Sequence, residues 1–184
     1  MWHRTNGTRH HRSLSDRGVE WMIGWAVVNS RLLRRRQHIY RAYRQLGYQV
    51  NTPGDAAGLP STAVAHALAA SDRYWRRWLA AEVALSLALG PAVGVLALGG
   101  MLWVLAAWLT ESAWAMGMDV SDAAVTHRLA QVLIRQLAAL WTSPPSQPGR
   151  VWRRYLIVGW GQEWRWGRPV IRESRRQLSG RSGL

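Results

Sequence analysis

The sequence predicts an all-α fold: a helical bundle around an apolar central helical hairpin that Gly and Pro interrupt, with basic Arg/Trp-rich arms at both ends. Three observations support this prediction. Apolar residues recur at helical spacing over much of the chain. The run 83–109 contains 27 residues without a charge, and Gly90–Pro91 interrupts it. The basic residues gather toward the two ends of the chain.

Charge divides the 184-residue chain into three parts. Residues 1–46 carry ten Arg against two acidic residues, and residues 150–184 carry nine Arg against two. Residues 47–149 carry five Arg against six acidic residues, so the net charge of +14 belongs to the ends. Basic ends of this kind bind phosphate groups, either of nucleic acid or of anionic lipid.

The N-terminal quarter is predicted to contain a disordered basic tail and one basic amphipathic helix. Residues 1–18 have no apolar period and lack the features of a secretory signal. Residues 19–47 place apolar side chains at helical spacing, and the helix should stop at Gly47. Its other face is arginine-rich and includes Arg34, Arg35 and Arg36. Two interpretations stay open: a helix on anionic lipid, or a solvated basic face over a packing stripe.

Residues 48–60 are predicted to be a linker, because Pro, Gly and Asn are frequent there. A helical core is expected over 61–142. Where its first helix enters the apolar run, Arg and Trp alternate, a pattern that membrane–water interfaces favour. These residues are Arg73, Trp75, Arg76, Arg77 and Trp78. In a soluble protein the same cluster would be an exposed basic turn with two half-buried indoles.

The apolar run allows two structures. It is longer than the roughly 20 residues that span a bilayer, but Pro91 favours two helices that meet at a corner. We expect a re-entrant or deeply packed segment, because the arm 82–90 is too short to cross. The second helix should end at Gly117, and Asp122 should lie at the start of an amphipathic helix.

Residues 143–149, SPPSQPG, form a Pro-rich linker and the clearest boundary in the chain. The C-terminal arm, residues 150–184, mixes tryptophan with arginine. Its candidate headgroup-binding residues are Arg153, Arg154, Trp160 and Trp164. Such segments partition to lipid headgroups, and they also stack on single-stranded nucleic acid.

Patterns typical of catalysis are missing. The sequence has no glycine-rich phosphate loop ending in Gly–Lys–Ser/Thr, no His–Glu–x–x–His and no Gly–x–Ser–x–Gly. The absence of Cys excludes disulfides, cysteine zinc sites and a thiol nucleophile. We therefore predict a protein that is not an enzyme and that uses neither a cofactor nor a metal. Glu111, near the end of the apolar helix, is the one candidate for a buried or paired carboxylate.

A family resemblance rests on three features of the core: Gly90–Pro91, the step Glu111–Ser112–Ala113, and the loop Gly117–Met118–Asp119. With these features, about residues 62–141 resemble the EcsC-like family of bacterial proteins. The resemblance implies an all-helical, membrane-associated protein without an assigned activity. The family's association with ABC-transporter operons further implies a regulatory or accessory role.

Two hypotheses follow from these patterns. In the first, the chain is a non-enzymatic accessory or regulatory component of a bacterial membrane process. It would bind anionic lipid on the cytoplasmic side of the inner membrane, with a membrane protein or transporter as partner. In the second, it is a soluble helical bundle whose Arg-rich arms bind nucleic acid or an acidic partner protein. The 13 Trp residues and the uncharged run favour the first hypothesis.

Overall fold

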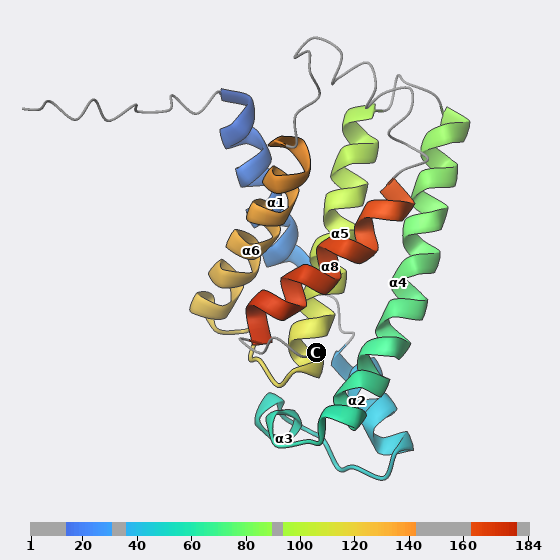
Figure 1. The fold of residues 1–184 in the computed structure, drawn as a ribbon, viewed down its shortest axis with the longest axis vertical. Coiled ribbons are helices and arrows are strands. Elements are labelled where there is room, and N and C mark those ends of the chain that lie inside the picture. The colour runs from blue at the N-terminus through green and yellow to red at the C-terminus, as the bar shows by residue number, and fades with distance from the viewer. Residues whose placement is uncertain (1–13, 31–35, 90–93, 143–162, 180–184) are drawn as a thin grey trace, which may run out of the picture.

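The computed structural model describes residues 14–30, 36–89, 94–142 and 163–179. Within these ranges the chain forms α-helices and no strand, which confirms the all-α prediction. The helices are α1 (Leu14–Ser30), α2 (Arg36–Gln45), α3 (Pro53–Ala57), α4 (Ser61–Leu89), α5 (Gly94–Ala115), α6 (Ala123–Thr142) and α8 (Glu163–Ser179). Figure 1 shows an elongated bundle in which α4 and α5 stand side by side and α8 crosses in front of them.

Helices α4 and α5 form the predicted central hairpin, and residues 90–93 between them lie outside the described ranges. Helix α5 contacts each of the other described helices. From residue 101 to residue 115 its side chains are buried, except for the half-buried Trp103. This part of the apolar run is therefore packed core, one of the two structures that the sequence allows. Among the described helices, none combines the length and the hydropathy that a bilayer crossing needs.

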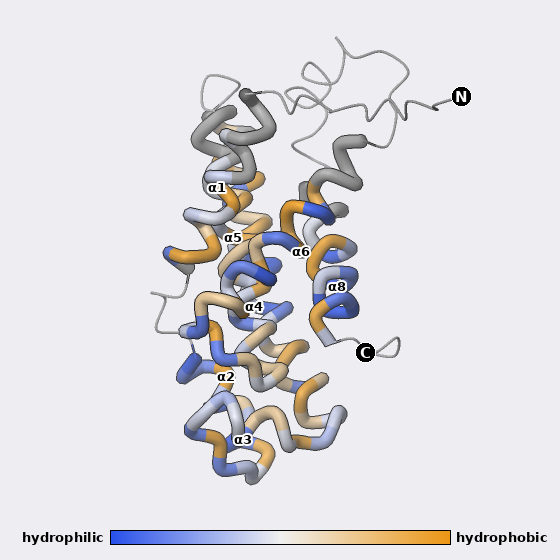
Figure 2. Tube along the Cα trace, turned by 90° about the vertical axis from the view of Figure 1, so that its left-hand side faces the viewer, coloured by the Kyte–Doolittle hydropathy of each residue, from blue (hydrophilic) through white to orange (hydrophobic). Residues whose placement is uncertain are grey.

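Buried side chains form two clusters. The main core lies between α1, α4, α5, α6 and α8; its members include Val27, Leu79, Leu105, Leu133 and Ile171. The lower core, at the bottom of Figure 1, joins α2, α3 and the first turns of α4; its members include Ile39, Tyr43, Val50, Ala56 and Ala67. Figures 1 and 2 together place α1 and α8 on opposite sides of α5. Figure 2 also shows the hydrophilic residues that α8 carries.

The range 19–47, predicted as one helix, corresponds to two described helices. The structure contains two helices there, α1 and α2, on either side of residues 31–35, which are outside the described part of the chain. The two helices pack in different places, because Ile23 of α1 belongs to the main core and Tyr43 of α2 to the lower core. The helical period runs through both segments, but it does not reveal that their apolar faces bury against different partners.

Two predicted boundaries need correction as well. Helix α1 begins at Leu14, so the end of the predicted tail 1–18 is helical. The predicted linker 48–60 contains α3, which a capping box orders. The Thr52 hydroxyl accepts the N–H of Asp55 at 3.3 Å, and the Asp55 carboxylate accepts the N–H of Thr52 at 2.9 Å. These hydrogen bonds, with one from the Asn51 N–H, hold the pKa of Asp55 below its usual value.

Helix ends that depend on local residues are confirmed. Gly47 (φ 87°) follows α2 and Gly117 (φ 79°) follows α5, and both adopt the left-handed conformation that favours glycine. Each starts a Schellman motif; at the end of α5 the N–H of Met118 donates to the carbonyl of Ala113 at 2.9 Å. The Asp122 carboxylate caps α6 by accepting the N–H two residues later at 2.8 Å.

The described part of the C-terminal arm is not separate from the core. Helix α8 packs against α4, α5 and α6, and it continues through Pro169. Its inward face is apolar apart from one serine and consists of Val170, Ile171, Ser174 and Leu178. The expectation of a surface arm over 150–184 is therefore corrected for α8, because apolar residues at helical spacing bury one of its faces. The predicted linker 143–149 lies outside the described ranges.

Candidate functional site

A layer of polar side chains joins α4 to α5 inside the bundle. Each helix supplies one carboxylate and one tryptophan three residues apart: Asp72 and Trp75 on α4, and Trp108 and Glu111 on α5. The indole N–H of Trp108 donates to Asp72 at 2.8 Å, and the indole N–H of Trp75 donates to Glu111. The two helices run in opposite directions, and the order of carboxylate and tryptophan in the motif Asp–x–x–Trp of α4 is reversed in the motif Trp–x–x–Glu of α5. Each carboxylate therefore accepts a hydrogen bond from the tryptophan of the other helix.

Arg175 of α8 binds the Asp72 carboxylate from the other side. Its Nη2 lies 2.5 Å from Asp72 Oδ1 and its Nη1 lies 3.2 Å from Oδ2, so the contact is bidentate. The same guanidinium donates to Ser112 Oγ on α5, at 3.0 Å from Nε and 2.8 Å from Nη2. The side chain of Arg175 is 13% exposed and that of Asp72 is 30% exposed. This ion pair attaches α8 to both helices of the hairpin.

Glu111 is buried and paired. It is 1% exposed, and its two carboxylate oxygens contact different helices. One oxygen accepts the indole N–H of Trp75, and the other lies 3.3 Å from Nδ1 of His38 on α2. The carboxylate thus connects α2, α4 and α5 at the boundary between the two cores, which is a structural role.

The predicted interface cluster on α4 divides in two. Arg73, Arg77 and Trp78 are exposed, and a shallow groove of about 320 Å³ runs along the arginines and Ala80. Arg76 is half-buried, and its Nε donates to the carbonyl of the residue four positions earlier at 3.0 Å. These side chains are available at the surface, as an interface role requires.

Trp75 does not belong to this surface, so its assignment to a lipid interface is wrong. It is 2% exposed and packs in the main core, where its ring meets that of Tyr74 edge-on at 5.1 Å. The hydrogen bond to Glu111 accounts for the inward position, because a buried indole needs a partner for its N–H. Sequence spacing alone does not distinguish Trp75 from its exposed neighbour Trp78.

The other candidate residues have varied positions. Arg36 is exposed at the start of α2. Five of the remaining candidates lie outside the described part of the chain: Arg34, Arg35, Arg153, Arg154 and Trp160. The sixth, Trp164, belongs to α8, but its side chain is not described.

Two tryptophans near the start of the predicted basic helix, Trp21 and Trp25, also belong to the surface set. Trp21 is 69% exposed and Trp25 is 53% exposed, while Ile23 and Val27 on the other face of the helix are buried. The spacing of Trp21, Trp25 and the partly exposed Val28 places them on one face. Helix α1 is therefore apolar on two faces, and its exposed tryptophans are those that the interpretation of a helix on anionic lipid would use.

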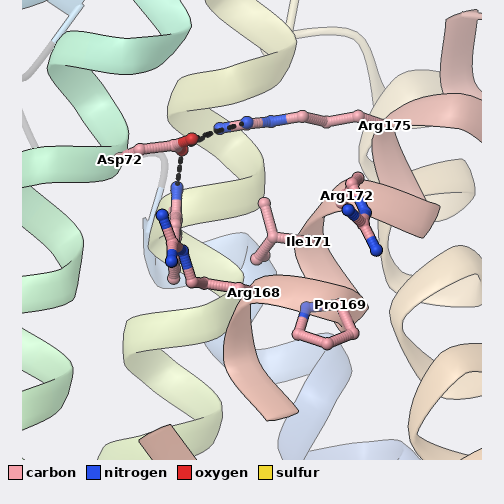
Figure 3. Close-up of a pocket in the computed structure, with 7 residues that line it drawn as sticks. Asp72, Arg168, Pro169, Ile171, Arg172 and Arg175 are labelled. Carbon is pink, nitrogen blue, oxygen red and sulfur yellow. Dashed lines mark hydrogen bonds and ion pairs between the residues drawn. The ribbon is translucent and has the colours of Figure 1, made fainter. Parts of the chain in front are cut away.

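A cavity of about 620 Å³ lies between α8 and the α4–α5 hairpin (Figure 3). Its lining consists of Asp72, Trp108, Arg168, Pro169, Ile171, Arg172 and Arg175. Sequence reasoning missed this cavity, because the docking of α8 was not predicted. Within the described ranges no group of three His, Cys, Asp or Glu side chains is placed to hold a metal ion.

No protein-family model, curated protein or solved structure matches this chain. The resemblance to the EcsC-like family stays a prediction.

Proposed function

We propose that this chain is a non-enzymatic helical protein that binds the surface of an anionic membrane. In this role it is an accessory or regulatory component of a bacterial membrane process, as the resemblance to EcsC-like proteins also implies. The observation that carries the proposal is exposed tryptophans on two helices: Trp21 and Trp25 on α1, and Trp78 on α4, where Arg73 and Arg77 are exposed as well.

The tryptophans supply the apolar part of the interaction. Trp21, Trp25 and Trp78 are 69%, 53% and 49% exposed, and Leu85 on α4 is 55% exposed. Indole rings favour the membrane–water interface, where the ring is buried and its N–H stays hydrated. Moving about 100 Å² of apolar surface from water into this interface is worth roughly 2.5 kcal/mol. Several such side chains therefore hold a protein at a membrane without a helix that crosses it.

Arginine supplies the electrostatic part. Arg73 and Arg77 precede Trp78 by five residues and one residue, and neither forms an ion pair within the described ranges. Each basic residue close to an anionic surface adds about 1 kcal/mol, and added salt weakens this contribution. The formal charge of +14 acts in the same direction over a longer range.

A second candidate function uses the same charge. Helix α2 exposes Arg36, Arg41 and Arg44, and a polyanion such as nucleic acid or an acidic protein would bind these residues equally well. The exposed tryptophans on α1 favour lipid over this alternative, because the exposed residue that follows them on the same face of α1 is the apolar Val28.

The test is cosedimentation with vesicles of phosphatidylcholine alone and of phosphatidylcholine with one-third phosphatidylglycerol. We expect the wild-type protein to bind the anionic vesicles and to lose affinity as salt increases. Trp21→Ser with Trp25→Ser should weaken binding about tenfold or more, because each exposed indole contributes on the order of 1 kcal/mol or more. Arg73→Gln with Arg77→Gln should reduce the affinity for anionic vesicles more at low salt than at high salt, because salt screens the charge that is removed.

The matched control is the double variant Arg135→Gln with Arg176→Gln, which removes the same charge from exposed positions on α6 and α8. It should bind vesicles more tightly than the Arg73/Arg77 variant. Failure of the wild type to bind either vesicle would reject the proposal. Binding to single-stranded RNA without binding to vesicles would support the second candidate instead.

A further inference from the structure

We infer that the cavity between α8 and the α4–α5 hairpin binds a dianionic phosphate monoester, with its phosphate held by Arg168, Arg172 and Arg175. This inference does not depend on the proposed membrane role, because none of the residues that line the cavity belongs to the exposed tryptophans and arginines on which that role rests.

The arrangement of the arginines follows from the sequence of α8. Arg168, Arg172 and Arg175 are spaced by four and three residues, so they lie along one side of the helix. In Figure 3, Arg168 and Arg175 extend from α8 toward α4 and α5, whereas Arg172 lies beyond Ile171 and points away from Asp72. A ligand between Arg168 and Arg175 would therefore meet guanidinium groups on two sides, and the exposed Arg172 would turn toward it on binding.

The charge of the cavity matches a phosphate dianion. Three arginines and one aspartate line it, which leaves two positive charges in excess. Asp72 does not compete with a ligand for Arg168 and Arg172, because both of its oxygens already accept hydrogen bonds from Arg175 and one also accepts from Trp108. The side chains of Arg168 and Arg172 form no hydrogen bond or ion pair with any described residue. A phosphate monoester carries about −1.5 to −2 charges at pH 7.

Arg175 makes part of the site rigid before a ligand arrives. Its guanidinium is fixed by Asp72 and Ser112 and is 13% exposed, so little side-chain entropy is lost when it contacts an anion. Arg168 and Arg172 are exposed and free to turn toward the ligand. Planar guanidinium groups bind phosphate oxygens with paired hydrogen bonds, and Arg168 and Arg172 can supply such pairs. Arg175 would add a single N–H from Nη1, because its other donors already bind Asp72 and Ser112.

The rest of the cavity suits an organic group attached to the phosphate. Trp108, Pro169 and Ile171 contribute apolar surface to its lining. The volume of about 620 Å³ falls among those of small-molecule sites, which are on the order of 300–1,000 Å³. The phosphate could belong to a soluble metabolite or to the headgroup of a monoester lipid such as phosphatidic acid, and the chemistry recognised is the same.

The test is isothermal titration calorimetry of the full chain with phenyl phosphate, and with benzenesulfonate as a ligand of similar shape and one charge. We expect saturable binding of phenyl phosphate, at least about tenfold tighter than that of benzenesulfonate. Arg168→Gln with Arg172→Gln should weaken phenyl phosphate binding about tenfold or more, and both residues are exposed, so the fold should be kept. Arg135→Gln with Arg176→Gln is again the control of equal charge.

Vesicles then identify the source of the phosphate. Tighter binding to vesicles with phosphatidic acid than to vesicles with phosphatidylglycerol, lost in the Arg168/Arg172 variant, would support a lipid headgroup. Phenyl phosphate binding without such a preference would support a soluble ligand. The inference is overturned if neither probe binds, if benzenesulfonate binds as tightly as phenyl phosphate, or if the control variant loses as much affinity as the Arg168/Arg172 variant.

Discussion

Trp108 on α5 donates its indole N–H to the carboxylate of Asp72 on α4 at 2.8 Å, across 36 positions of sequence. The same carboxylate binds Arg175 on α8, 103 positions away. One acidic side chain therefore joins three helices. The polar layer between α4 and α5 contains a second pair of the same kind, in which the buried Trp75 donates its indole N–H to Glu111. The layer therefore consists of two carboxylates, each of which accepts a hydrogen bond from a buried tryptophan.

Replacing Asp72 by Asn should destabilise the protein by about 2–3 kcal/mol, because Arg175 would lose its anionic partner in a largely buried position. Urea denaturation followed by circular dichroism measures this change in the free energy of unfolding. Amide hydrogen exchange should also speed up in α8, since the ion pair attaches that helix to the hairpin. Glu173→Gln is the control: it removes an exposed pair with Arg176 and should cost less than about 0.5 kcal/mol. Equal losses in the two variants would contradict this account.

Trp75→Phe and Trp108→Phe remove the same atoms from two positions that are each at most 2% exposed. After Trp108→Phe, Asp72 keeps both hydrogen bonds to Arg175. After Trp75→Phe, the more deeply buried Glu111 loses a donor, so this variant should be less stable than Trp108→Phe by about 1 kcal/mol. Chemical denaturation of both variants measures the difference between their free energies of unfolding. A greater loss of stability in Trp108→Phe would contradict the prediction that the hydrogen bond from Trp75 to Glu111 is the more important of the two.

Gly117→Ala should destabilise the protein more than Gly47→Ala. Both glycines have a positive φ, of 79° and 87°, so an alanine at either position costs about 1–2 kcal/mol of backbone strain. A Cβ on Gly47 would meet nothing within 4 Å, whereas a Cβ on Gly117 would lie 2.5 Å from the backbone nitrogen of Ala57, the last residue of α3. This overlap adds roughly 1–3 kcal/mol. Thermal unfolding of both variants should show the larger decrease for Gly117→Ala, and similar decreases would mean that α3 moves away at little cost.

Tyr43 should make stability fall at alkaline pH. Its hydroxyl donates to the carbonyl of Ala115, and burial raises its pKa from 10.0 to about 12. Because the folded state holds this proton more tightly than the unfolded state, the stabilisation is complete below pH 10 and is lost as the pH rises toward 12. Tyr43→Phe should lower stability at pH 7 by about 1 kcal/mol and should flatten the decline above pH 10. Urea midpoints measured from pH 7 to pH 11.5 test this; parallel curves for the two proteins would count against it.

Helix identity and several helix ends could be predicted from the sequence, because the interactions that set them act within a few residues. Apolar periodicity predicted the helices of the core, and Gly47, Gly117 and Asp122 marked their ends. A left-handed glycine or a capping carboxylate acts on its own turn, whatever the rest of the chain does. Glu111 was a candidate for a buried or paired carboxylate because it follows an apolar run, but its partners Trp75 and His38 could not be predicted from the sequence.

Positions that depend on which faces meet could not be predicted in this way. The inward position of Trp75, the division between α1 and α2, and the docking of α8 each depend on a partner far away in sequence. The cavity exists because Arg175 meets Asp72 over 103 positions, and no local pattern records that distance. An all-α chain, its charge at the two ends and its principal helix ends could be predicted from local sequence patterns. Which tryptophans and arginines face water could be seen only in the folded chain, because burial depends on the summed contacts of several helices and not on any one of them.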